Sequence, residues 1–181
     1  MLRWWLRRGL DAFGRRWDYD MGYAHDLLDA DPGALRRFAK VMGLSAYCRD
    51  LPAEVWFAAK ITAMLAEDCG PCTQLNVRMA ESAGIPAPLL RAVLARDFAA
   101  MPEAVVLGVR FTQAVLAHDI EADDLRALIV RRWGKRALVT LGFAITSARL
   151  YPTLKYALGH GQACVRVRVG GTEQPVLRRA A

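Results

Sequence analysis

The sequence predicts an all-α protein made of a single helical domain with basic ends. Apolar residues recur at spacings of three and four along nearly the whole chain, which is the period of helices that bury one face. Asp or Pro opens several of these stretches and Gly closes several, as at helix boundaries. The 181 residues are 54% hydrophobic and 24% charged, a composition typical of a globular domain. We expect about seven to nine helices within residues 1–181.

Residues 1–20 are predicted to form a basic amphipathic extension. Its apolar stripe at helical spacing consists of Leu2, Trp5, Leu6, Leu10 and Phe13, with arginines around it. We expect the stripe to pack on the chain's own domain or on a neighbouring subunit. The alternative is contact with an anionic membrane surface, which basic amphipathic helices also bind.

The next two helices have clear boundaries. Asp31 is a favoured N-cap, Pro32 suits a first turn, and Gly43 follows the last apolar position of the segment. Leu51-Pro52 opens the second helix, which runs to the acidic pair at residues 67–68 and is apolar on most of its surface. A helix of this kind is predicted to be buried.

The following segments continue the helical pattern. Gly84 and Gly134 each follow an apolar periodic stretch and are predicted to end helices. Tyr151-Pro152 is predicted to interrupt the last long helix, because proline lacks an N–H and disfavours helix in the preceding residue. The expected helices span about 73–83, 88–96, 103–118, 121–133 and 135–150, with a short turn or helix at 152–161.

The end of the chain, residues 161–181, is predicted to be a basic tail with one short strand. Val165, Val167 and Val169 alternate with arginines, as in a half-buried strand. Because one strand cannot form a sheet, we expect it to pair with a second copy of the chain or to remain unpaired.

The net charge of +7 comes from the two ends. Residues 1–16 hold five Arg and one Asp, residues 161–181 hold four Arg and one Glu, and the charges between them balance. A nucleic-acid-binding domain more often carries its charge as a patch on the fold, so we expect no nucleic-acid partner. No apolar run approaches the roughly 18 residues of a membrane span. The start lacks a signal-peptide pattern, which predicts a cytoplasmic protein.

Cys69 and Cys72 form a CxxC motif, CGPC, at a predicted helix start. This spacing brings the two sulfurs within disulfide reach on a first turn. Free backbone N–H groups and the helix dipole there favour a thiolate, which is the nucleophilic form of cysteine. Such a pair alternates between dithiol and disulfide and reduces peroxides or disulfides without a bound cofactor.

The motif has three other interpretations. Structural zinc needs four ligands, and the sequence has no second CxxC or His pair to complete a site. CGPC is the thioredoxin tetrapeptide, but that family places it after a β-strand, whereas the residues before Cys69 are predicted to be helical. Two buried structural thiols are the remaining alternative.

The stretch WFAAKITAMLAEDCGPCTQLNVRMAESAGI joins a buried helix, the CxxC motif and a helix ending in Ala-Gly. This order resembles the carboxymuconolactone decarboxylase-like superfamily, and especially its alkylhydroperoxidase D-like branch. The resemblance covers about residues 50–158, including FTQAVLAHD, LRALIVRRWG and ALVTLGFAITSARLYP. It implies an all-α domain of the alkylhydroperoxidase D-like type.

The resemblance also implies roles for the two cysteines. Cys72 is the expected attacking thiol and Cys69 the resolving thiol, with the reverse order left open because Cys69 lies nearer the helix start. No metal, flavin or haem is implied, so we expect no cofactor. The branch usually forms trimers or hexamers, which implies a homo-oligomer.

The sequence departs from the family pattern at its proton relay. Asn76 stands where the family has a His one turn after the second cysteine, and Pro71 where a second His often lies. Phe57 stands where the family has a Glu. Asn and Phe cannot act as bases, so the relay of the family is missing as written.

Three carboxylates near the motif are candidates for the missing base. Glu67 and Asp68 lie beside the motif, and Glu54 lies about a turn from the expected position on the preceding helix. The alternative for Glu67 and Asp68 is a solvated helix end.

Other reactive residues have simpler interpretations. His25, His118 and His160 are predicted to be surface or helix-end residues. Cys48 and Cys164 are either a second redox pair or isolated buried thiols. Lys60 either stabilises a thiolate or extends its amine to the surface, and we expect the second.

The sequence thus predicts a thiol-dependent oxidoreductase that reduces hydroperoxides through Cys69 and Cys72. Its partners would be a hydroperoxide or disulfide substrate, a dithiol reductant and further copies of the chain. The alternative is a redox-sensing or scaffolding helical oligomer without enzymatic activity, which Asn76 and Phe57 favour.

Overall fold

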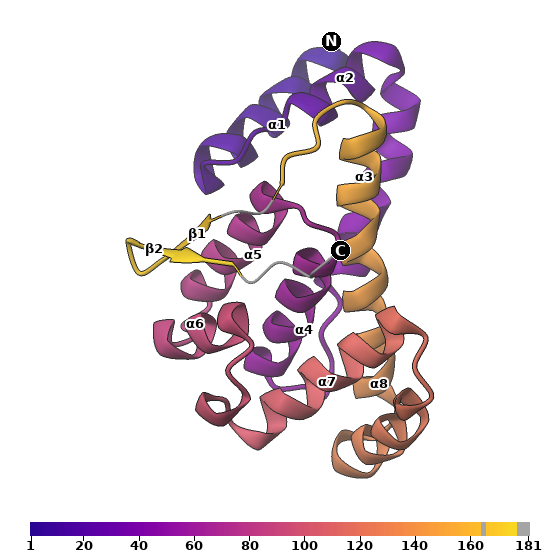
Figure 1. The fold of residues 1–181 in the computed structure, drawn as a ribbon. Helices are drawn as coiled ribbons and strands as arrows, with labels where there is room; N and C mark the ends of the chain where they lie inside the picture. The colour runs from indigo at the N-terminus through magenta and orange to yellow at the C-terminus, as the bar shows by residue number, and fades with distance from the viewer. Residues whose placement is uncertain (164–165, 177–181) are drawn as a thin grey trace.

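Helix α4 (Ala53–Ala66) lies at the centre of the fold, as its apolar sequence predicts. Nine of its fourteen residues are buried, from Val55 to Met64. Helices α5 (Gly70–Ser82), α7 (Glu103–Ala117) and α8 (Glu121–Ala157) pack around it (Figure 1). The hydrophobic core lies among these four helices and α6 (Ala87–Ala95).

The computed structural model describes residues 1–163 and 166–176. Within them the chain is mostly helical, which confirms the all-α prediction. The other elements of this part are α1 (Leu2–Trp17), α2 (Gly22–Ala30), α3 (Pro32–Ala46), a 3₁₀ turn (Phe98–Ala100), β1 (Arg166–Val169) and β2 (Thr172–Pro175). The described residues contain no helix that is both long and apolar enough to cross a membrane.

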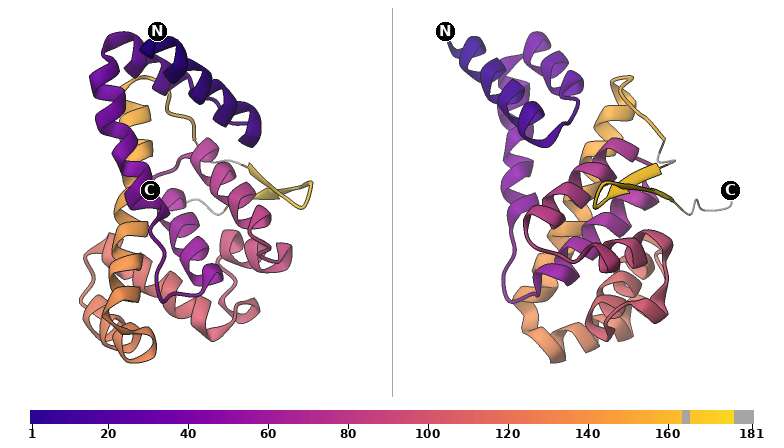
Figure 2. Two further views of the ribbon diagram at one scale, coloured as in Figure 1. Left: turned by 180° about the vertical axis from the view of Figure 1, so that it is seen from behind. Right: turned by 90° about the vertical axis from the view of Figure 1, so that its left-hand side faces the viewer.

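The first three helices form one end of the molecule (Figures 1 and 2). The carboxylate of Asp31 accepts hydrogen bonds from the N–H groups of Gly33 and Ala34, so Asp31 is the N-cap that the sequence predicts. From there α3 runs along α8. Leu6 and Leu10 of α1 pack on a second small core around Leu28 of α2. Three of the five residues of the predicted apolar stripe, Leu6, Leu10 and Phe13, thus pack on the chain itself, while Leu2 and Trp5 are exposed.

Helix α8 bends at Gly134, where the sequence predicts a helix end, but it continues through Pro152, where the sequence predicts an interruption. Gly134 has φ 84° and ψ 174°, which separates two helical halves. The predicted interruption at Tyr151-Pro152 is wrong, because helix continues through Pro152 to Ala157. Proline removes one backbone hydrogen bond, but Tyr151 packs on Phe38 and Lys155 contacts Tyr19, which hold the helix on both sides.

The predicted lone strand is also wrong, because β1 pairs with β2 of the same chain in an antiparallel hairpin. Gly170 and Gly171, both at positive φ, make the two-residue turn that such hairpins prefer. Val167 and Val169 are fully buried in the core shared with α5 and α6. The side chain of Gln74 donates to the carbonyl of Arg168 and accepts from its N–H, as a neighbouring strand would. Residues 164 and 165 lie outside the described residues.

Candidate redox site

Cys69 and Cys72 form a disulfide at the N-terminus of α5, with their Cα atoms 5.3 Å apart. Cys69 is the N-cap residue of the helix, and Gly70 and Pro71 make its first turn. The N–H and hydroxyl of Thr73 both donate to the carbonyl of Cys69. Both cysteines are buried, at 0% and 1% exposure. Reagents therefore reach the sulfurs only through openings in the surrounding packing.

The end of α8 and the segment after it hold the motif in place. Asp68, which precedes Cys69, has φ 48°, and its carbonyl accepts a hydrogen bond from the hydroxyl of Tyr156. The N–H of Gly70 donates to the carbonyl of Gln162. The turn that places the two cysteines therefore depends on residues nearly a hundred positions later.

The two cysteines have different surroundings. Cys69 packs against Ala63, Met64 and Ala148 in a small buried cluster. Cys72 belongs to the same cluster but also lines a cavity of about 480 Å³ between α1, α3, α4 and α5. Of the two sulfur residues, only Cys72 lines this cavity, within the part of the chain that the structure describes. We call it the apolar cavity below, since most of its lining side chains are hydrophobic.

A tyrosine and a lysine extend the site beyond the cysteines. The hydroxyl of Tyr19 lies 3.8 Å from Sγ of Cys72. Nζ of Lys155, a residue only 1% exposed, donates to the same hydroxyl at 3.4 Å and lies 4.8 Å from the centre of the Tyr19 ring. Burial raises the pKa of Tyr19, so its hydroxyl keeps its proton and can donate it. Burial lowers the pKa of Lys155, while the nearby charge of Asp20 acts in the opposite direction.

Arg78 of α5 fixes the segment that carries Tyr19. Its guanidinium donates to the carbonyls of Trp17 and Asp18 and pairs with the carboxylate of Asp18 at 2.6 Å. Asp18 is in the left-handed conformation, φ 45°, which turns the chain out of α1. The ring of Tyr19 then packs edge-on against Phe13, with centroids 6.4 Å apart. Helix α5 thus supplies both Cys72 and the residue that anchors its tyrosine neighbour.

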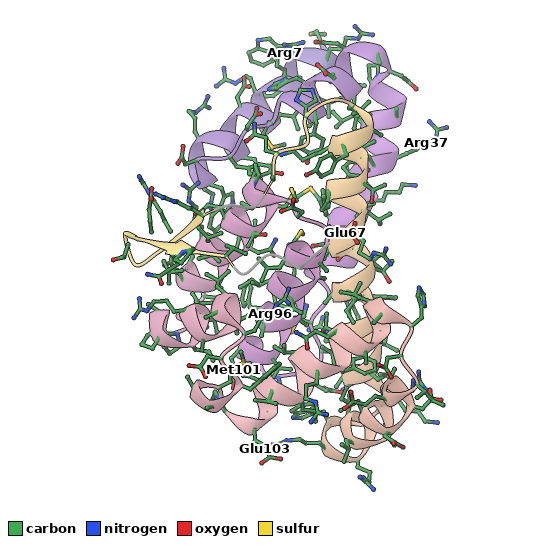
Figure 3. All side chains as sticks on the ribbon, viewed as in Figure 1. Arg7, Arg37, Glu67, Arg96, Met101 and Glu103 are labelled. Atoms are coloured by element: carbon green, nitrogen blue, oxygen red, sulfur yellow. A yellow bond between two sulfur atoms is a disulfide. The ribbon has the colours of Figure 1, made fainter. Side chains whose placement is uncertain are left out.

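The carboxylates proposed as substitute bases lie elsewhere. Glu67 accepts from Nε of Arg149 at 2.6 Å, at the side of α4 that faces α8 (Figure 3). Within the described chain, neither Glu54 nor Glu67 nor Asp68 lines the apolar cavity beside Cys72. Phe57 is buried in the main core. Phe57 therefore has a packing role.

Asn76 lies one turn after Cys72 and is 4% exposed. Its Nδ2 donates to the carbonyl of Cys72 at 3.0 Å. Its Oδ1 is buried and has no hydrogen-bond partner among the described residues. Asn76 therefore offers an unpaired acceptor one turn after Cys72, although it cannot move a proton.

Lys60 is buried at 4% exposure, so the prediction that its amine reaches the surface is wrong. Helix α4 places it in the wall of the apolar cavity, where Nζ donates to the carbonyl of Ser45 and lies 4.3 Å from the centre of the Trp56 ring. Burial lowers the pKa of Lys60 to about 8. Burial raises the pKa of the nearby Cys48 thiol, while the charge of Lys60 acts against this rise.

The histidines and Cys48 have partners other than the cysteine pair, or lie at a helix end. His118 is the C-cap of α7, which confirms a helix-end position, while His25 pairs with Asp11 and His160 with Asp26. The thiol of Cys48 lies 3.7 Å from the carbonyl of Leu51. Cys164 lies outside the described residues.

Sequence reasoning missed Tyr19 and Lys155. Tyr19 belongs to the segment predicted as a basic extension, and Lys155 to the short turn predicted after Pro152. No local pattern marks either residue, because their proximity to Cys72 arises only when the turn after α1 and the last part of α8 meet near the start of α5.

Comparisons with protein-family models, with curated proteins and with solved structures return no match to this chain.

Proposed function

We propose that this protein is a thiol-dependent oxidoreductase that reduces hydroperoxides, with Cys72 as the attacking thiol and Cys69 as the resolving thiol. One observation carries the proposal: Sγ of Cys72 lies beside a protonated tyrosine hydroxyl in the wall of a cavity, within disulfide reach of Cys69. Cys69, enclosed by the small cluster, is suited to the resolving role.

The reaction balances in two steps. The thiolate of Cys72 attacks the terminal oxygen of a hydroperoxide, an S–O bond forms and the O–O bond breaks, giving a sulfenic acid and an alkoxide. The alkoxide takes a proton and leaves as an alcohol. The thiol of Cys69 then attacks the sulfenic sulfur, which releases water and forms the disulfide. A dithiol reductant restores both thiols and is itself oxidised to a disulfide.

Tyr19 is the proposed proton donor in the first step. Its hydroxyl lies at the sulfur, and its raised pKa keeps it protonated until an alkoxide, a much stronger base, forms next to it. The proton lost when Cys72 ionises then restores the hydroxyl. Lys155 is the proposed positioning residue, because its amine holds the tyrosine oxygen and places positive charge near the thiolate.

We further propose that the chain is of the alkylhydroperoxidase D-like type. The support is the order of a buried α4, the CxxC motif at the start of α5 and the apolar α8. In this proposal Tyr19 and Lys155 replace the family's His and Glu relay.

The second candidate function is a redox sensor without peroxidase activity. It is favoured by the contact between Tyr19 and Cys72, since Tyr19 links α1 and α2 to the rest of the chain. Reduction of the disulfide would change this contact and with it the packing of the first three helices.

Single-turnover oxidation of the reduced protein by cumene hydroperoxide tests the proposal. We expect the wild type to lose two thiols at least about a hundredfold faster than a free thiol of ordinary pKa reacts. Cys69→Ser should accumulate a sulfenic acid, whereas Cys72→Ser should not react. A wild-type rate equal to that of free thiol would contradict the proposed peroxidase activity. The redox sensor would then be the remaining candidate function.

A further inference from the structure

The apolar cavity has the size and lining of a small-molecule site. Its volume of about 480 Å³ lies within the usual range of about 300–1,000 Å³ for such sites. Helices α1, α3, α4 and α5 supply its hydrophobic wall, with Leu6, Leu10, Phe13, Met42, Met64 and Met79 among the lining residues. Methionine side chains adapt to ligands of varied shape, so this wall suits a flexible hydrocarbon.

Two residues with nitrogen donors, Trp56 and Lys60, line this wall. Trp56 and Lys60 are one turn apart on α4, and Nζ of Lys60 lies over the indole ring of Trp56 at 4.3 Å from its centre. Nε1 of Trp56 is buried and has no hydrogen-bond partner within the described part of the chain. Nζ of Lys60 has three donors, and among the described residues only the carbonyl of Ser45 accepts from it.

No carboxylate of the described residues forms an ion pair with Lys60, although this ammonium is 4% exposed. Burial of a charge without a counter-charge is costly, as is burial of an indole N–H without an acceptor. A bound carboxylate would accept from both nitrogens and offset both costs. An alcohol or an alkane would not supply the negative charge.

A third polar group lies at the cysteine end of the cavity. Oδ1 of Asn76 is buried, lacks a partner among the described residues and sits one turn after Cys72. This atom can only accept, so a ligand that satisfies it carries a hydrogen-bond donor such as an O–H group at this end of the cavity. Hydroxyl and hydroperoxide groups on a hydrocarbon chain both meet that requirement.

We propose that the apolar cavity binds a single-chain carboxylate of the fatty-acid class, with the carboxylate held by Nζ of Lys60 and Nε1 of Trp56. The hydrocarbon chain lies against the hydrophobic wall. A chain that carries a hydroperoxide presents it to Asn76 and Cys72. Binding stands on the cavity alone, whereas reduction of the bound hydroperoxide rests on the function proposed above.

Calorimetric titration of the oxidised protein tests binding without any redox chemistry. The probes are dodecanoate and dodecanol below their micellar concentrations, which share a chain and differ in head-group charge. We expect saturable binding of dodecanoate about ten- to a hundredfold tighter than that of dodecanol, the range of a charge-assisted hydrogen bond. Equal affinities would overturn the head-group assignment.

Two variants locate the site. Lys60→Met keeps the length and removes the charge, and should abolish the preference for dodecanoate. The matched control is Lys40→Met, an exposed lysine of α3 outside the cavity lining, which should bind as the wild type does. Trp56→Phe keeps a ring and removes the N–H, and should weaken dodecanoate several-fold without changing dodecanol. Unchanged binding in Lys60→Met would overturn the proposal.

A cavity-filling variant guards against binding elsewhere on the surface. Ala39 lines the cavity yet is exposed, so Ala39→Phe should fold and should block both probes. The proposal would also be overturned if the wild type bound neither probe saturably. That result is expected if a second copy of the chain covers the cavity. If the protein bound dodecanoate but did not reduce hydroperoxides, the proposed carboxylate site would be supported and the proposed peroxidase activity would be contradicted.

Discussion

The hydroxyl of Tyr19 lies 3.8 Å from Sγ of Cys72, although 53 positions separate the two residues in the sequence. Arg78, on the same helix as Cys72, anchors the turn that carries the tyrosine. The hydroxyl also accepts a hydrogen bond from a buried lysine, Lys155. A thiolate at Cys72 would therefore form next to an O–H donor that is itself polarised by a cation.

Tyr19→Phe should slow the reaction of Cys72 while leaving the fold intact. The variant removes one hydrogen bond to the thiolate, which is worth about 1.5–3 kcal/mol for a charged acceptor. We expect cumene hydroperoxide and iodoacetamide to react at least about tenfold more slowly with the reduced variant at pH 7. Tyr47→Phe is the control, because Tyr47 packs on Phe143 outside the cavity. Equal rates for the two variants would show that the Tyr19 hydroxyl does not assist the reaction of Cys72.

Lys155→Met should change the pH dependence of the same reaction. Burial lowers the pKa of Lys155, so its positive charge is lost at a lower pH than that of an ordinary lysine as pH rises. The rate advantage of the wild type over the variant should therefore be largest near pH 7 and should shrink toward pH 10. A constant ratio across this range would indicate a purely structural role. Lys135→Met, on an exposed position of α8, is the control.

Lys60→Met should stabilise the protein at pH 7, and the gain should shrink in alkali. The folded-state pKa of Lys60 is about 8 against an ordinary 10.5, so the folded state disfavours the proton that the unfolded state retains. The difference corresponds to a penalty of about 3 kcal/mol that is complete below pH 8 and is relieved as pH rises toward 10.5. Urea unfolding of both proteins at pH 7 and pH 9.5 measures it. A gain that grows with pH would contradict the sign of this pKa shift.

Two glycine substitutions should have opposite effects on stability. A Cβ on Gly108 would lie 2.5 Å from Cγ1 of Val55, a fully buried residue of α4, so Gly108→Ala should cost about 1–3 kcal/mol. A Cβ on Gly142 of α8 meets nothing within 4 Å, so Gly142→Ala should add about 0.5–1 kcal/mol through helix propensity. Thermal unfolding of both variants measures the difference. Equal effects would mean that α7 does not cross α4 at Gly108.

Much of the fold could be predicted because its causes are local. Asp31 caps a helix with its own carboxylate, and the apolar sequence of α4 requires burial wherever that helix lies. Pro152 and the tail were predicted wrongly for a shared reason. Contacts of Tyr151 and Lys155 hold the helix through the proline, and burial of Val167 and Val169 on α5 and α6 favours a hairpin. Such contacts join segments that are distant in the sequence.

The candidate site also has a part that follows from local sequence and a part that depends on contacts between distant segments. The sequence by itself determined the cysteine pair, because a spacing of three at a helix start brings the sulfurs of Cys69 and Cys72 together whatever surrounds them. Only the tertiary structure decided which sulfur faces a cavity and which groups surround it. Tyr19 lies in the turn after α1, Lys60 on α4 and Lys155 on α8, and they have no shared pattern along the chain. Their positions follow from how α1 packs against α5 and α8 against α4, and packing is a property of whole surfaces rather than of neighbouring residues.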